Sequence, residues 1–207
     1  MSVLTIARPF GAGGKTVGKI VAKKLGYKLV EEEMVIAVAK KARVSPDWVR
    51  SVEKERGNFL LNFIEGIVSP SFIEKLQNDK HRGYIDEDIY ADLLAEVMEE
   101  FARENNVVIL GRGGQYFLKD FKGVCHVLLT DNFDSRVKFI EKHYNMSFSR
   151  ARQVVSRGDK RRANFYKKLK HKHYDDPSLY DIVINMGRVD IDAACGLITD
   201  LLAKQTG

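Results

Sequence analysis

The feature that most constrains this chain is a glycine-rich loop between an apolar strand and a helix. The strand is predicted over Val3–Ala7 and the helix over Lys15–Leu25. The loop and helix start read Gly11, Ala12, Gly13, Gly14, Lys15 and Thr16. Glycines let consecutive backbone N–H groups turn inward around an anion, and a helix start adds unpaired N–H groups and a positive dipole end. This arrangement predicts a loop that binds the phosphates of a nucleoside triphosphate or a similar ligand.

Two side chains at the helix start extend this prediction to a metal-bound nucleotide. Lys15 supplies a positive charge to phosphate oxygens, and the Thr16 hydroxyl is a candidate Mg²⁺ ligand. The standard pattern is GxxxxGK[ST], and Pro9 stands where its first glycine belongs. The subclass of nucleotide-binding protein therefore stays open, as does a simpler alternative, a glycine-rich turn that binds nothing.

The rest of the chain alternates short apolar runs with helical patterns. Five strands are predicted, over Val3–Ala7, Tyr27–Val30, Val107–Leu110, Cys125–Thr130 and Asp181–Asn185. Helices are predicted over Lys15–Leu25, Asp86–Arg103, Asp134–His143, Ser149–Arg157 and Ile191–Leu202. The third and fourth strands are apolar without alternation, which is typical of a parallel sheet covered on both faces. We therefore expect one α/β domain over residues 1–207, built on a five-stranded parallel sheet.

Two stretches depart from this alternation. Residues 31–105 carry helical signals and no strand signal, so a helical insertion is expected between the second and third strands. Residues 157–174 are rich in Lys, Arg, His and Tyr and lie just before the last strand. Such a basic stretch indicates either a solvated charged face or a surface that meets an anion.

Net charge, apolar runs and cysteines indicate which classes of partner and which cellular compartment to expect. The formal net charge of +6 suits an anionic partner, whether nucleotide, nucleic acid or membrane surface. No apolar stretch approaches the roughly 18 residues that a membrane-spanning helix needs, so no membrane partner is expected. Cys125 and Cys195 lie in apolar patterns without CxxC spacing, which favours free thiols and a reducing cytoplasm over a disulfide or zinc site.

The order of these motifs resembles that of the cytidylate kinase-like family, a branch of the nucleoside monophosphate kinases within the P-loop fold. Bacterial cytidylate kinases carry a loop of the form GPSGSGKGT, and Arg8–Thr16 lies over it without a gap. In this register Gly14 takes the place of the lysine, and Lys15 that of the next glycine. The resemblance implies a P-loop three-layer α/β/α fold with ATP and Mg²⁺ as ligands. It also implies that residues 31–105 bind the acceptor and that about 157–174 form a basic lid.

A second match implies an acceptor-phosphate site after the third strand. The segment from Val107 to Gly114 resembles the VIVGRGA segment of the family, whose arginine holds the acceptor phosphate. Arg112 carries that role by position. Independently of the resemblance, an arginine at the carboxyl end of a parallel strand lies where such sheets bind ligands, and its planar fork suits phosphate. The alternative, a solvated loop arginine, stays open.

A third match lies in the basic stretch. The segment from Ser156 to Arg162 resembles the family's lid, where arginines close over both nucleotides. Positive charge donated to the moving phosphoryl group is the main catalytic lever in such transfers. The candidates are Arg157, Arg161 and Arg162, with Asp159 expected to orient one of them. A solvated, charged helix end is the alternative.

Three further positions complete the candidate site. Glu31 follows the second strand and resembles the acidic residue that begins the family's acceptor-binding region, although a solvated helix start explains it equally well. Arg136 lies in the helix that the family uses near the donor nucleotide. The third strand ends in Leu110 and offers no carboxylate, so Mg²⁺ is expected on Thr16, water and phosphate oxygens.

Together these residues predict ATP-dependent phosphoryl transfer to a nucleoside monophosphate, with CMP or dCMP as the default acceptor. The alternative is a non-catalytic nucleotide-binding regulator that kept the fold, since the lysine is displaced. We expect nucleotide substrates and not nucleic acid as partners, because a lid explains the same basic residues. Nothing in the sequence indicates the oligomeric state or the acceptor base.

Overall fold

A computed structural model of the chain describes residues 2–42, 44–47, 49–50, 87–171 and 173–206. Five parallel strands form one sheet in the order β2-β3-β1-β4-β5. The strands are β1 Val3–Ala7, β2 Lys28–Val30, β3 Val107–Leu110, β4 Val124–Thr130 and β5 Ile182–Asn185. Each coincides with a predicted run to within one residue at either end, and the five-stranded parallel sheet is confirmed.

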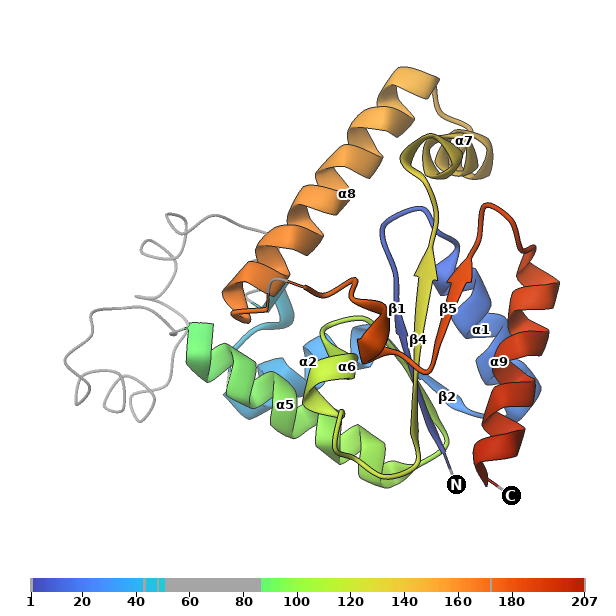
Figure 1. The fold of residues 1–207 in the computed structure, drawn as a ribbon. Coiled ribbons are helices and arrows are strands. Elements are labelled where there is room, and N and C mark those ends of the chain that lie inside the picture. The colour runs from blue at the N-terminus through green and yellow to red at the C-terminus, as the bar shows by residue number, and fades with distance from the viewer. Residues whose placement is uncertain (1, 43, 48, 51–86, 172, 207) are drawn as a thin grey trace.

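Helices cover both faces of this sheet and make three layers (Figure 1). One face carries α1 Gly14–Leu25 and α9 Ile191–Thr206, which pack on each other. The other face carries α2 Glu32–Ala42, α5 Glu87–Glu104 and α6 Gly114–Phe117. The three-layer α/β/α fold expected from the sequence is therefore confirmed.

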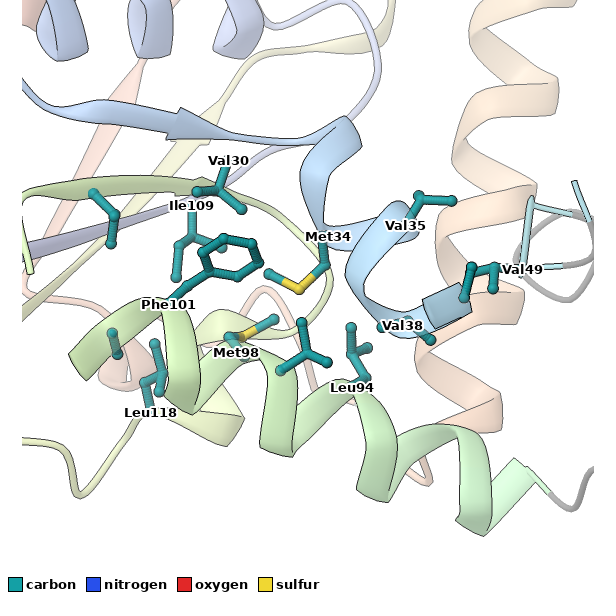
Figure 2. Packing of buried hydrophobic residues seen from close by; sticks show 14 of the residues in the cluster. Val30, Met34, Val35, Val38, Val49, Leu94, Met98, Phe101, Ile109 and Leu118 are labelled. Atoms are coloured by element: carbon teal, nitrogen blue, oxygen red, sulfur yellow. The ribbon is translucent and has the colours of Figure 1, made fainter. Parts of the chain in front are cut away.

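Side chains alternate along the strands and so build two separate cores, one for each face. Leu4 and Ile6 of β1 join the cluster under α1 and α9, whereas Val3 joins the cluster under α2 and α5. In the second cluster Met34, Met98 and Phe101 fill the space between α2, α5 and the sheet (Figure 2). The described part of the predicted insertion, outside residues 43, 48 and 51–86, is thus helical and shares the main core.

Two α-helices between β4 and β5 lie on the side of the molecule toward which the strands point (Figure 1). They are α7 Phe133–Tyr144 and α8 Phe148–Lys168. Asn132 and Ser147 cap their starts, each accepting a hydrogen bond from a backbone N–H three residues on. The helix predicted for Ser149–Arg157 was too short, because α8 continues through Gly158 for eleven further residues. Gly158 and the charged residues after it weaken the helical signal in the sequence, and tertiary contacts allow the helix to continue there.

The structure offers no membrane span among its described residues, since none of those helices is both long and apolar enough. Cys125 and Cys195 are free and buried. Burial raises the pKa of the Cys125 thiol to about 12, so this side chain acts as a small apolar core residue.

His126 makes the stability of this fold depend on pH. Its Nδ1 lies 2.7 Å from the Thr5 hydroxyl between β4 and β1, and burial lowers its pKa despite the nearby Asp181 carboxylate. Below the ordinary histidine pKa of about 6.5 the unfolded chain takes up a proton that the buried ring resists. Stability is therefore expected to fall as the pH drops from 7 toward 5, and less steeply in His126→Gln. Urea unfolding of both proteins at pH 7.5 and 5.5 measures this difference, and equal slopes would contradict it.

Candidate active site

The glycine loop has the backbone conformation that an anion nest needs. Gly11 and Gly13 have φ values of 87° and 74°, in the left-handed region that other residues avoid. Gly13 caps α1, and Gly14 is the first residue of the helix. The loop therefore ends at an exposed helix start, as the sequence predicts for a phosphate site.

Strand register brings this loop beside the turn that follows β3. Ile6 of β1 pairs with Leu110 of β3, and Ala7 pairs with Leu128 of β4. The Gly111 N–H then donates to the Ile6 carbonyl at 2.9 Å. The carboxyl ends of β1 and β3 thus deliver Arg8, the glycine loop and the Arg112 turn to one edge of the sheet.

Two cavities flank the glycine loop at this edge. The first, of about 410 Å³, is lined among the described residues by Arg8, Pro9, Phe10, Glu31, Leu110, Gly111, Arg112, Gly158, Arg161, Arg162, Phe165 and Tyr166. The second, of about 540 Å³, is lined by Gly11, Ala12, Gly13, Asp131, Ser135, Phe139, Met186, Val189, Asp190, Ile191 and Asp192. We call them the arginine cavity and the loop cavity. Four arginines and one glutamate line the first, whereas the second combines loop backbone and apolar side chains with the carboxylates of Asp131, Asp190 and Asp192.

Arg112 reaches the arginine cavity from a turn that is strained for any residue but glycine. Its φ is 54°, and its neighbours Gly111 and Gly113 also have positive φ values. Arg112 Nη1 donates to the Glu31 carbonyl at 2.7 Å, which fixes the guanidinium across the gap between two loops. A left-handed arginine costs about 1 kcal/mol, and such outliers gather at functional positions.

One stripe of α8 forms the opposite wall of the arginine cavity. Gly158, Arg161, Arg162, Phe165 and Tyr166 line it, at the three- and four-residue spacing of a single helix face. Arg157 is exposed and is not among the described residues that line either cavity. Gly158 lets the helix approach the loop, because a Cβ there would lie 2.6 Å from the Phe10 Cβ.

Arg162 is held in place and still lacks a partner for one end of its guanidinium. Its Nη1 lies 2.8 Å from an Asp175 oxygen, and its guanidinium carbon lies 4.5 Å from the centre of the Tyr174 ring. Its Nη2 is buried and makes no hydrogen bond within the described part of the chain. A buried donor without a partner is costly, and an anion in the arginine cavity would satisfy it.

Aromatic contacts fix the carboxyl end of α8 against α6. The Tyr166 ring stacks on Tyr174 at 4.4 Å, and its hydroxyl accepts from Gln115 at 3.2 Å. Tyr116 stacks on His171 at 3.6 Å, and burial raises the pKa of Tyr116 to about 12. The basic stretch predicted as a lid is therefore anchored to the core in this structure, apart from residue 172, which lies outside the described residues.

Asp159 orients an arginine, but one from α7 and not from α8. Arg136 Nη1 and Nη2 lie 2.8 and 2.9 Å from the two Asp159 oxygens. The same guanidinium donates to the carbonyls of Phe10 at 2.9 Å and Asp131 at 3.2 Å. Arg136 thus ties the glycine loop to the α7–α8 pair, and it is not among the described residues that line the loop cavity.

Lys15 forms an ion pair with Glu31, which lines the arginine cavity. Lys15 Nζ lies 2.7 Å from Glu31 Oε2, and 61% of the Lys15 side chain is exposed. The hydrogen bond to Glu31 raises the pKa of Lys15. Glu31 therefore holds three neighbouring groups, Lys15 and Arg8 through its carboxylate and Arg112 through its carbonyl.

Comparisons with known proteins assign the family. The model of the cytidylate kinase-like family matches residues 3–188. The chain belongs to this family. A protein of Archaeoglobus fulgidus described as "Cytidylate kinase" is 26% identical over 201 residues, covering 94% of this chain and 91% of the relative.

Solved structures with low sequence identity share the fold of this family member. An uncharacterized protein from Eubacterium ventriosum aligns with a TM-score of 0.67 and 21% identity, covering 98% of each chain. A shikimate kinase from Bacteroides thetaiotaomicron aligns with a TM-score of 0.50 and 14% identity, again covering 98% of each chain. The sheet and its flanking helices are thus those of P-loop kinases.

In this cytidylate kinase-like chain, the residues near the glycine loop suit a metal ion that takes most of its ligands from a bound nucleotide and few from the protein. No three His, Cys, Asp or Glu side chains gather as metal ligands in the described segments. Thr16 lies half-buried in the first turn of α1, beside the glycine loop. This placement is compatible with a cation held by Thr16, phosphate oxygens and water, which stays a prediction.

Sequence reasoning missed three residues that build the arginine cavity. Arg8 and Tyr166 line it, and Asp175 holds Arg162. The partners of Arg162 lie beyond the helix in a loop, and no local pattern indicates their contact. Arg8 had a signal in the register of the cytidylate kinase loop GPSGSGKGT, where Arg8 stands at the first glycine and Gly14 stands at the lysine.

Proposed function

We propose that this chain transfers the γ-phosphoryl group of ATP to the phosphate of a nucleoside monophosphate, with CMP or dCMP as the expected acceptor. The observation that carries the proposal is the pair of cavities on either side of one glycine loop. An arginine-lined cavity with a buried, unpartnered Arg162 Nη2 suits an acceptor that itself carries a phosphate. The loop cavity, with Phe139, Met186 and Ile191, suits the base and sugar of the donor.

The reaction needs no covalent enzyme intermediate. An oxygen of the acceptor phosphate attacks the γ-phosphorus, and the bond from this phosphorus to the β–γ bridging oxygen breaks. The products are a nucleoside diphosphate and ADP, and no proton need move because the attacking phosphate is already ionised. The enzyme's work is to align the two phosphates and to supply positive charge.

The arginines have separate tasks in this proposal. Arg112, fixed by the Glu31 carbonyl, binds the acceptor phosphate, and Arg162, fixed by Asp175, binds the group in transit. Arg161 closes the exposed side, and Arg157 at the edge of the same helix adds long-range charge. Lys15 and the N–H groups of the loop bind the donor phosphates.

Further residues complete the donor side of the proposal. Mg²⁺ held by Thr16 supplies charge neutralisation of the β- and γ-oxygens when it is bound. Arg136 and Asp159 keep the loop in shape from outside the cavities. The cytoplasm expected from the two free cysteines remains a prediction.

An assay of ADP release with ATP, Mg²⁺ and single acceptors tests this proposal. We expect turnover with at least one of CMP, dCMP, UMP, AMP and GMP, highest for the cytidine nucleotides, and none with shikimate, which has no phosphate for the arginines. ATP binding without ADP release for any acceptor would favour the alternative, a non-catalytic nucleotide-binding regulator. Turnover with shikimate alone would contradict the acceptor class.

A further inference from the structure

Arg8 lies at the boundary between the glycine loop and the acceptor side of the site. It directly follows β1, and its side chain, 23% exposed, lines the arginine cavity together with Arg112 and Arg162. Its Nη2 lies 3.4 Å from Glu31 Oε1, the second oxygen of the carboxylate that binds Lys15. Arg8 is therefore a largely buried cation directed into the cavity and held by one carboxylate.

Two glycines leave the space that the Arg8 side chain occupies. A Cβ on Gly14 would lie 2.6 Å from Arg8 Cγ, closer than real Cβ atoms approach. Gly14 starts a regular helix and needs no unusual backbone angle, so this crowding is the visible reason for a glycine there. A Cβ on Gly111 would also collide with Arg8 Nη1. The Arg8 side chain thus runs over the start of α1, where donor phosphates bind, toward the turn that presents Arg112.

Lys15 occupies a different environment from Arg8. Its side chain is 61% exposed, it pairs with Glu31, and it is not among the described residues that line either cavity. In the standard pattern the lysine of the helix start reaches the β- and γ-phosphates. In the register of the cytidylate kinase loop Gly14 takes the place of that lysine, and the space beside Gly14 is filled by the aliphatic part of the Arg8 side chain.

We propose that Arg8 is the catalytic cation that contacts the γ-phosphoryl group, taking the task that the lysine of the standard loop performs. The inference rests on the proposed function, because it assigns this chain a donor triphosphate. The aliphatic part of Arg8 lies against Gly14 on the donor side, and its guanidinium lies against Gly111 on the acceptor side, at the end of the path that a phosphoryl group would take from donor to acceptor. Gly14 and Gly111 provide the space, and Glu31 holds the guanidinium until the nucleotides bind.

The charges around Arg8 favour the arrival of an anion. Burial lowers the pKa of Arg8, and the nearby Arg112 and Arg162 lower it further, against the opposing effect of Glu31. Like charges gathered in a low-dielectric cavity repel one another until a negative group binds between them. A γ-phosphoryl group with its three oxygens fits that requirement, and the planar fork of arginine suits two of those oxygens at once.

Equilibrium binding of ADP and of the non-hydrolysable β,γ-imido analogue of ATP, both with Mg²⁺, tests the assignment without turnover. Arg8→Ala should weaken the ATP analogue about tenfold or more and ADP less than threefold, because only the analogue carries a γ-phosphate. Arg8→Lys should recover part of the loss, and Lys15→Ala should weaken both ligands alike. Arg103→Ala, an exposed arginine paired with Glu99 on α5, is the matched control and should change neither.

Gly14→Ala provides a second variant that keeps every charge. Its new Cβ must displace Arg8, so it should reproduce the loss for the ATP analogue and add nothing in an Arg8→Ala background. Where turnover is measured, Arg8→Ala should lower kcat about a thousandfold, the range of an arginine in phosphoryl transfer. Melting temperatures of all variants exclude unfolding as the cause.

The outcomes separate this inference from the proposed function. If Arg8→Ala weakens the binding of ADP and of the ATP analogue equally, the role of Arg8 is overturned, even if the wild type turns over. The same holds if neither Arg8→Ala nor Gly14→Ala weakens the binding of either ligand. A wild type that binds ATP without transfer, with the selective loss still seen in Arg8→Ala, would refute the transfer reaction and leave Arg8 as the γ-phosphate contact.

Discussion

Arg112→Ala is expected to lower kcat/KM for the acceptor monophosphate by about a hundredfold, the usual effect of truncating one partner of a hydrogen-bonded charge pair. KM for ATP should change less than threefold. The loss should fall on the acceptor because Arg112 lines the arginine cavity, where its Nη1 donates to the Glu31 carbonyl at 2.7 Å. Initial rates with each substrate varied in turn measure the split, and a loss confined to ATP would contradict the assignment.

Arg112→Gly separates catalysis from backbone strain at the same position. Both variants lose the guanidinium and should have the same low activity. Glycine adopts the φ of 54° freely, so Arg112→Gly should be more stable than Arg112→Ala by about 1 kcal/mol. Urea unfolding of the two variants measures the difference. Equal stability would mean that the turn relaxes when Arg112 is removed.

Arg136→Met should destabilise the fold by about 3 kcal/mol, the lower end of the cost of breaking a buried ion pair. Only 7% of the Arg136 side chain is exposed, whereas Asp159 is 34% exposed and recovers some hydration, which favours the lower value. For a chain of this length the loss corresponds to a fall in Tm of roughly 9 °C. Arg152→Ala, which removes a more exposed arginine 3.6 Å from Asp134, should shift Tm by a degree or two at most.

The same variant discriminates between two roles for Arg136. The sequence suggests a contact with the donor nucleotide, whereas the structure places the guanidinium between Asp159 and the Phe10 carbonyl. A structural tie predicts a lower Tm with KM for ATP little changed at a temperature where the variant is folded. A raised KM for ATP with an unchanged Tm would instead support the contact with the donor.

Sequence patterns predicted the fold well because they are local. Apolar runs such as Val107–Leu110 mark strands that are buried on both faces, and parallel pairing follows from the helices between them. The length of α8 escaped prediction, because Gly158 interrupts the local helical signal. Its place in the helix depends on contact with Phe10, nearly 150 residues earlier.

The candidate site was predictable only where a motif carried it. Arg112 and the glycine loop follow strands, and strand ends in a parallel sheet converge. The partner of Asp159 was not predictable, because Arg136 reaches it across the α7–α8 pair. The sequence hint at Arg8 could not be interpreted without the structure, because it depends on Gly14 and Gly111, almost a hundred residues apart, lying against one side chain.

The central claim is that the two cavities hold donor and acceptor on either side of one glycine loop. A structure of the chain with a cytidine–adenosine pentaphosphate, which joins both nucleotides in one molecule, tests it most directly. We expect adenosine in the loop cavity, cytidine on the side of Arg112, and a phosphate chain that passes Arg8 and Arg162 Nη2. A phosphate chain that leaves the arginine cavity empty would contradict it.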